Sequence, residues 1–423
     1  MTEVGTLLVV VGGGLSALVS VQLMIAFANS WAKVRADAEH KNLSLRLLRN
    51  KMEAMKVLHK EYEQSKRYSW TGYRKFRVDV KKELSDVTSC YFRPHDGKKL
   101  PPFKPGQFLT FQFKLPDEDK PLIRCYSLSD KPNDEYYRIS VKKILPPRDK
   151  PELPSGKSST YINEVLKSDE IIDVKIASGN FYLETREHSP IVLIGGGIGV
   201  TPVYSMLRTL AAEDSEREVW FFYGLRNKTE QLYSEELKEI ARTHPNMHIC
   251  LCYSNPEPDD KEGEDYQYAE RVSVDLFKRV LHVNNYVFYI CGPPPMMNSL
   301  VSDLEAWDVP SEHVRFEAFG PASVKKTRAK KKDDAASQES FAVKFSRSGK
   351  ECQWTGEEDS ILELATANDI GLAMSCGIGN CGTCMVALKK GTVDYPAKPG
   401  FDFDAGTCLP CIARPTGPVE IDG

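Results

Sequence analysis

The segment from Cys376 to Cys384 constrains the fold more than any other part of this chain, because its cysteines follow the spacing C-x4-C-x2-C. Cys408 and Cys411 come near the C-terminus. Four thiolates with this plant-type spacing hold a [2Fe–2S] cluster, whereas a zinc site fits the x4-x2 spacing and its glycines poorly. The sequence therefore predicts a cluster bound by Cys376, Cys381 and Cys384, with a fourth ligand from Cys408 or Cys411.

The rest of the chain is much longer than a cluster domain needs. Its 423 residues are enough for about three domains of roughly 100–200 residues each. Beyond the four ligands, the other cysteines are scattered singly, as expected for reduced thiols in a cytosolic compartment. A formal net charge of -3 gives no reason to expect a nucleic-acid partner.

The N-terminal segment is unlike the rest in composition. Residues 4–32 carry no charge, and 7–28 are nearly all apolar, which suits a helix of about 20 residues across a bilayer. Basic residues follow at once, and positive charge stays on the cytoplasmic side. We therefore predict a single-pass membrane anchor over 4–32, with the N-terminus outside and the catalytic domains cytoplasmic. The alternative is a buried or processed helix.

Four further regions follow along the chain. In residues 33–70, Pro and Gly are absent up to about Lys66, and Leu and Met recur near the period of a helix. This pattern predicts a juxtamembrane helix, which is either a solvated spacer or lies on an anionic membrane surface. Residues 73–187 alternate short β-rich runs with turns, which predicts an antiparallel β-barrel. Residues 189–320 alternate continuous apolar runs with helices, which predicts a doubly wound parallel sheet. Residues 321–340 form a basic linker before a last domain at 341–423.

Two short motifs lie in the β-rich region. Arg124, Tyr126 and Ser127 form R-x-Y-S at the end of a β-rich run, offering a cation for a phosphate, an aromatic face and a hydroxyl. Gly156 and Ser159 belong to a glycine and hydroxyl run that enters a helix, where free backbone N–H groups make an anion site. An ordinary helix cap would have the same composition.

Two more motifs follow buried strands of the α/β region. The run that contains Gly195, Gly197, Gly199 and Thr201 lets backbone approach a pyrophosphate, although Val200 departs from a clean GxGxxG. Cys291 opens C-G-P-P-P-M after the last such strand. The four motifs, in this order, resemble the ferredoxin–NADP reductase superfamily over residues 73–320. The flavin region is most similar to the reductase part of flavohaemoglobins.

The resemblance implies roles for these residues. Arg124 would bind a flavin phosphate, Tyr126 would stack on the isoalloxazine, and Ser127 would lie near flavin N5. Gly156 and Ser159 would hold the pyrophosphate side. The nicotinamide nucleotide would rest on the loop that contains Gly195, Gly197, Gly199 and Thr201. Cys291 would lie close to the nicotinamide, and Phe319 would flank the flavin.

The same resemblance bears on cofactor choice. Similarity to flavohaemoglobin reductases favours FAD, although oxygenase reductases of the phthalate dioxygenase type use FMN and, like this chain, carry a ferredoxin domain last. Arg226 could meet a 2′-phosphate, as arginines do in NADP sites, or be a surface arginine. NADH is favoured over NADPH.

The C-terminal domain resembles plant-type ferredoxins over its whole length. Cys411 opens C-I-A-R-P-T, which is similar to the sequence around the last ferredoxin ligand. The resemblance therefore favours Cys411 as the fourth ligand and leaves Cys408 as a structural thiol.

Together the resemblances imply an iron–sulfur flavoprotein oxidoreductase that passes electrons from NADH to FAD, to [2Fe–2S] and to a partner protein. The predicted anchor points to a lipid bilayer and a membrane-bound oxygenase, hydroxylase or desaturase. One alternative is a quinone reductase subunit of a membrane redox complex, whose domain order differs. Another is a non-catalytic redox sensor.

Overall fold

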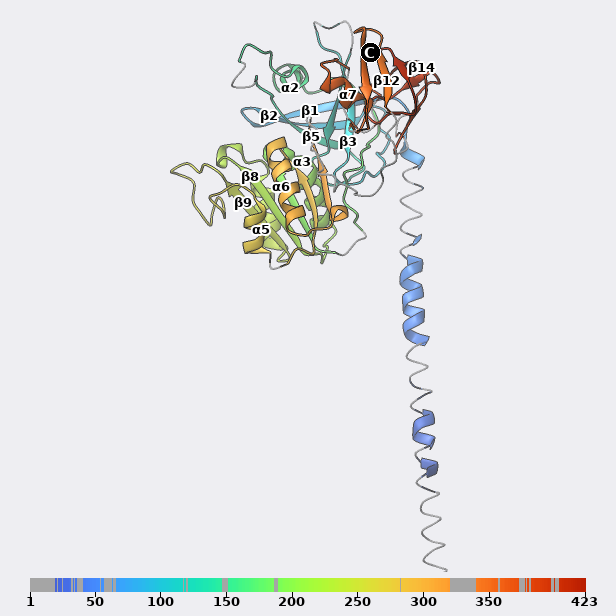
Figure 1. The fold of residues 1–423 in the computed structure, drawn as a ribbon. Helices are drawn as coiled ribbons and strands as arrows, with labels where there is room; N and C mark the ends of the chain where they lie inside the picture. The colour runs from blue at the N-terminus through green and yellow to red at the C-terminus, as the bar shows by residue number, and fades with distance from the viewer. Residues whose placement is uncertain are drawn as a thin grey trace, which may run out of the picture. The chain divides into compact units, whose positions relative to one another are not determined.

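The computed structural model describes most of the chain from residue 66 onward (Figure 1). The gaps after that point are 117, 119–120, 147–150, 186–188, 282, 320–339, 357, 373–376, 378, 380–381, 397–398 and 400–402. Before residue 66 it describes only 20, 22–24, 26–31, 33, 35, 41–53, 55–56 and 63. The chain divides into two compact units, Met1–Arg67 and Tyr68–Gly423.

Every described residue of the first unit is helical, and the juxtamembrane helix over 33–70 stays a prediction. Among the described residues, however, no helix is both long enough and apolar enough to cross a bilayer. The longest continuous run, 41–53, contains four basic residues: Lys41, Arg46, Arg49 and Lys51. The predicted single-pass membrane localisation is therefore wrong on this finding. Much of the predicted span 4–32 lies outside the described residues.

The antiparallel domain contains six strands in the order β4-β3-β6-β1-β2-β5. Buried Phe76 and Val78 alternate with exposed residues along β1, as in a sheet with one face on a core. An isolated bridge between Leu128 and Ile139 brings the chain just past β4 against β5, at the opposite end of the sheet order. The antiparallel sheet is as predicted, and its closure into a barrel stays a prediction. The strands are β1 (Arg74–Leu84), β2 (Val87–Pro94), β3 (Phe108–Phe113), β4 (Leu122–Ser127), β5 (Tyr137–Lys142) and β6 (Ile171–Val174).

The parallel domain contains five strands in the order β11-β10-β7-β8-β9. Ile191 and Leu193 on β7 join one core, while Val192 and Ile194 join another, so both faces of the sheet are buried. This burial explains the continuous apolar runs and confirms the doubly wound arrangement. The strands are β7 (Ile191–Gly196), β8 (Val219–Leu225), β9 (Met247–Tyr253), β10 (Val287–Cys291) and β11 (Val314–Glu317).

Helices cover the two faces of the parallel sheet in pairs. Residues of α3 (Val200–Ala212) and α4 (Ser234–Thr243) join one core, and residues of α5 (Val274–Val280) and α6 (Pro294–Ala306) join the other. Figure 1 shows α3 and α6 beside the strands of this sheet. Ser273 caps α5 by accepting a hydrogen bond from the Leu276 N–H at 3.2 Å. The strand order reverses between β7 and β10, and a crevice at such a switch point is where ligands bind in open α/β sheets.

The C-terminal domain is α+β. Its five-stranded sheet has the order β13-β12-β18-β14-β16, and β15 pairs with β17 separately. Ser360 caps its helix α7 (Ile361–Ala367), whose buried face packs on the sheet core. The strands are β12 (Phe341–Phe345), β13 (Lys350–Trp354), β14 (Val386–Lys390), β15 (Val393–Asp394), β16 (Thr407–Cys408), β17 (Arg414–Pro415) and β18 (Val419–Ile421).

Candidate functional site

Strand β4 carries the first set of predicted residues. Arg124 and Tyr126 share a face because side chains two apart in a strand point the same way. The Tyr126 hydroxyl lies 2.8 Å from Ser158 Oγ, which brings the start of helix α2 (Lys157–Thr160) beside β4. Burial raises the pKa of Tyr126 to about 12, so this phenol stays neutral. The half-buried Arg124 donates to the carbonyl of Ile123 at 2.7 Å.

Gly156 and Ser159 shape the turn that leads into α2. The Ser159 hydroxyl donates to the Gly156 carbonyl at 2.9 Å and accepts from the Ile144 N–H at 3.1 Å. A Cβ on Gly156 would meet Ser159 Oγ at 2.8 Å, so the turn has no room for a side chain there. Both residues thus have internal contacts, and Ser158 is the hydroxyl that faces Tyr126. Their role toward a pyrophosphate stays a prediction.

The glycine loop follows β7 and lies against the end of β10. A Cβ on Gly199 would meet the Cys291 carbonyl oxygen at 2.5 Å, whereas one on Gly197 would meet nothing within 4 Å. Gly195 pairs with Cys291 across the sheet. Buried Thr201 closes the loop by donating to the Ile198 carbonyl at 3.2 Å. The loop is therefore packed on one side and open on the other, which leaves space for a phosphate to approach backbone.

Ser127, Cys291 and Glu317 converge where β4, β10 and β11 end. The Ser127 hydroxyl donates to Glu317 Oε2 at 3.3 Å, across 190 positions of sequence. Glu317 is the register partner of Cys291. Burial raises the pKa of Glu317 to about 8, although the bond from Ser127 opposes the rise, and part of the residue's surface remains accessible. Burial also raises the pKa of the Cys291 thiol, with the Glu317 charge adding to the effect.

Phe319 and Arg226 lie at the margins of this arrangement. Phe319 comes two residues after Glu317 and is exposed, which leaves its ring free to cover a ligand. Arg226 follows β8, and its Nε lies 3.9 Å from Glu230 Oε1. The same carboxylate accepts from the Arg226 N–H at 3.3 Å. An acidic neighbour disfavours a second anion beside the arginine.

The structure brings two of the predicted cluster ligands together. The Sγ atoms of Cys384 and Cys411 lie 3.1 Å apart, and both residues are buried in a small cluster with Leu409. Cys408 instead belongs to the main core of the C-terminal domain, where burial raises its pKa to about 12. Cys376 and Cys381 lie outside the described residues.

Sequence reasoning missed Ser158 and Glu317. Ser158 stands beside the chosen Ser159, and only the phase of the helix decides which hydroxyl faces Tyr126. The sequence places Glu317, an acidic residue, at the end of the last parallel strand. Its partner Ser127 lies in another domain, so the sequence pattern gave no sign of their contact.

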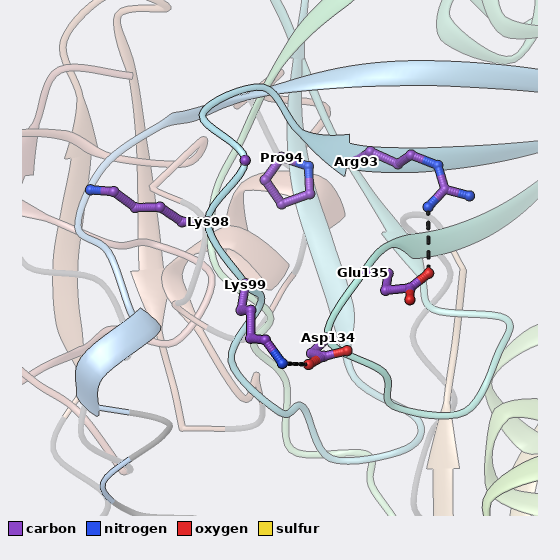
Figure 2. Close-up of a pocket in the computed structure, with 7 residues that line it drawn as sticks. Arg93, Pro94, Lys98, Lys99, Asp134 and Glu135 are labelled. Carbon is purple, nitrogen blue, oxygen red and sulfur yellow. Dashed lines mark hydrogen bonds and ion pairs between the residues drawn. The ribbon is translucent and has the colours of Figure 1, made fainter.

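A surface hollow of about 290 Å³ is lined by none of these residues (Figure 2). Four of its charged side chains form two pairs: Arg93 Nη1 is 3.8 Å from Glu135 Oε2, and Lys99 contacts Asp134. Its lining residues are Arg93, Pro94, Gly97, Lys98, Lys99, Asp134 and Glu135.

Comparisons with known proteins agree with this geometry. Residues 193–302 match the family described as "Oxidoreductase NAD-binding domain", and 343–416 match "2Fe-2S iron-sulfur cluster binding domain". A flavohemoprotein of Halalkalibacterium halodurans is 34% identical over 271 residues, or 63% of this chain and 65% of that protein. The chain thus spans a little under two thirds of the length of this relative.

Two solved structures share the fold. Phthalate dioxygenase reductase matches with a TM-score of 0.50 and 24% identity, over 83% of this chain and 98% of that one. Flavohemoglobin from Malassezia yamatoensis, solved with bound FAD and heme, matches with a TM-score of 0.50 and 27% identity, over 59% of this chain and 60% of that one.

The chain is an oxidoreductase with NAD-binding, FAD reductase and [2Fe–2S] domains, and its cofactors are FAD, NAD(P)H and a [2Fe–2S] cluster. The residues fit these groups. Tyr126 and Ser127 end strand β4, the loop around Gly197 is open on one side, and the thiols of Cys384 and Cys411 converge.

Proposed function

We propose that this oxidoreductase takes hydride from NADH and delivers electrons singly, through its [2Fe–2S] domain, to a separate oxygenase protein. The observation that carries the proposal is the hydrogen bond from Ser127 to Glu317, because it joins the end of the flavin strand to the strand ends that form the nucleotide crevice. Bound FAD would supply the acceptance of two electrons as hydride and their release one at a time, and a bound cluster would carry one electron.

The chain's own residues position the reactants, and one carboxyl group holds a proton beside them. Gly195 and Gly199 let backbone approach the dinucleotide phosphates. Buried Cys291 remains a neutral thiol beside the crevice, so it places no charge against the nicotinamide. Glu317 holds a proton at neutral pH because its pKa is about 8, and its Oε2 accepts a hydrogen bond from Ser127 Oγ at the end of strand β4.

NADH is the proposed donor. Glu230 lies beside Arg226 in two contacts, one to the side chain and one to the backbone N–H. A carboxylate in this position can accept hydrogen bonds from the hydroxyls of a ribose, and it repels a 2′-phosphate.

Cys384 and Cys411 are proposed ligands of the cluster, together with Cys376 and Cys381. The 3.1 Å separation of the two described sulfurs supports the first pair. Exposed Met385 follows buried Cys384 directly, so the protein surface begins one residue from this proposed ligand, where a partner could accept an electron. The oxygenase identity of that partner is supported by the fold shared with phthalate dioxygenase reductase.

Substitution of Cys384 by Ser tests the electron order. The variant should lose the cluster and the NADH-dependent reduction of cytochrome c, yet keep reduction of ferricyanide through the flavin. Cys352→Ser is the matched control, because Cys352 is a buried thiol of the same domain that lies in the sheet core.

Loss of both activities from a variant that still holds FAD would refute this order. An unmodified protein whose flavin and cluster are not bleached by NADH under anaerobic conditions would instead be a redox sensor.

A further inference from the structure

Strand β5 of the antiparallel domain contacts the parallel domain through alternate side chains. Arg138 lies against Tyr233, Ser140 accepts a hydrogen bond from the Tyr233 hydroxyl at 2.8 Å, and Lys142 Nζ is 3.6 Å from Glu230 Oε1. Residues two apart on a strand share a face, so this face of β5 is an interdomain contact. We call the set Asp130, Arg138, Ser140, Tyr204 and Tyr233 the β5 seam.

Arg138 is the centre of the β5 seam. Its guanidinium carbon lies 5.1 Å from the ring centre of Tyr233 and 5.7 Å from that of Tyr204. The two rings are stacked with centroids 3.9 Å apart and planes within 5°. Arg138 also donates from Nε to the Ser129 carbonyl at 3.2 Å. Its side chain is only 6% exposed, so these directed contacts replace its water.

Asp130 links the same region to helix α3. Its carbonyl accepts from the Ser205 hydroxyl at 2.6 Å, and its Oδ1 lies 3.4 Å from Arg208 Nε. The other carboxylate oxygen accepts from the Tyr136 hydroxyl at 3.0 Å. Asp130 is buried and comes only three residues after Ser127. The chain that leaves the flavin strand is therefore held directly on α3.

Both nucleotide-binding segments contribute to the β5 seam. Tyr204 lies in the first two turns of α3, which begins directly after Gly199. Tyr233 follows β8 in the segment that also contains Arg226, and its backbone is held at φ +61°. Non-glycine residues keep this left-handed conformation only when surrounding contacts enforce it. The loop for the phosphates and the segment for the ribose are thus tied to one strand of the flavin domain.

We propose that Arg138 is a positioning residue for hydride transfer: through Tyr204 and Tyr233 it sets the distance between the nicotinamide loop and the flavin strand. The inference rests on the proposed transfer from NADH to FAD. In this proposal Arg138 acts through the two tyrosine rings and not on the reacting atoms. Its contribution is to hold two rigid domains in one register, since a misplacement of about 1 Å can slow a reaction by about 100-fold.

Rapid-mixing kinetics of the full chain under anaerobic conditions test the proposal. Arg138→Met should slow flavin bleaching by saturating NADH by about 10- to 100-fold, with the dissociation constant for NADH changed less than threefold. Tyr233→Phe removes only the hydroxyl that donates a hydrogen bond to Ser140, and it should slow bleaching by a smaller factor. This variant also tests the proposal if Arg138→Met does not fold. Electron flow from chemically reduced flavin to the cluster should be unchanged in both.

Arg74→Met is the matched control. Arg74 also lies over an aromatic ring, 5.2 Å from the centre of Trp70, and pairs with Asp96 at 2.6 Å, away from the β5 seam. Its substitution should leave bleaching at the rate of the unmodified protein. Unchanged bleaching in a folded, FAD-loaded Arg138→Met would overturn the proposal, and so would unchanged bleaching in Tyr233→Phe if Arg138→Met does not fold. An equal slowing in Arg74→Met would also overturn it. If the unmodified protein is not bleached by NADH, the proposed function itself fails.

Discussion

Gly199→Ala is the substitution whose effect can be worked most directly from the structure. Gly199 has φ -63°, which any residue adopts, so alanine adds no backbone strain. Its Cβ would nevertheless lie 2.5 Å from the Cys291 carbonyl oxygen and 2.6 Å from Gly292 Cα. Ordinary contact begins at 3.4 Å, so the two loops must separate by about 0.9 Å. The perturbation is purely steric and is directed along the line between the two loops.

The expected magnitudes follow from that displacement. Overpacking against backbone costs about 1–3 kcal/mol of unfolding free energy, a loss that a domain of this size survives. A shift of about 1 Å between the glycine loop and Cys291 should lower the rate of flavin reduction by about 100-fold. We expect a folded protein with bound FAD that is reduced slowly by NADH.

Stopped-flow absorbance of the flavin, with thermal unfolding recorded on the same samples, separates the two effects. Gly371→Ala is the control, because a Cβ on Gly371 would meet nothing within 4 Å. A Gly199→Ala protein that is reduced by NADH as fast as the unmodified protein would refute the argument that the contact between the two loops shapes the nucleotide site.

Three further substitutions test other parts of the site. Folding raises the pKa of Glu317 to about 8, so the folded protein keeps a proton that the unfolded chain loses near pH 4.3. The contribution of this group to the free energy of unfolding is therefore fully present below about pH 4.3. It declines as the pH rises, until the pH passes about 8. Glu317→Gln is neutral throughout, so its melting temperature should fall less between pH 6 and pH 9 than that of the unmodified protein, and parallel melting curves would contradict the assignment. Cys411→Ser should abolish the visible absorbance of the cluster while Cys408→Ser keeps it, and the opposite result would make Cys408 the ligand.

Local patterns in the sequence predicted the elements of the fold well. Strand β3 occupies the run Phe108–Phe113, and β7 and β8 contain the continuous apolar runs that indicated buried parallel strands. Side-chain alternation and strand burial are decided by neighbouring residues, so a single sequence contains this information. The first unit shows the limit of the same reasoning, because the apolar composition of 4–32 predicted a span that no described helix provides.

Contacts between domains could not be predicted in this way. Ser127 was expected near the flavin, but its bond to Glu317 depends on how two domains meet. The contact between Tyr126 and Ser158 was not predicted, because one residue of helix phase decides whether the hydroxyl of Ser158 or of Ser159 faces Tyr126. Such pairings depend on tertiary geometry that residue type and spacing do not encode.

Hydrogen bonds join the antiparallel domain to the parallel domain near the residues of the candidate site. Apolar side chains can slide past one another with little change in free energy, whereas a hydrogen bond weakens steeply when its angle or length departs from the optimum. Ser127 with Glu317 joins the strand ends, and Ser140 with Tyr233 joins β5 to the segment after β8. Two directed contacts at separate points restrict both translation and rotation. The arrangement therefore favours one register of the domains, and this register is what transfer of a hydride between bound cofactors requires.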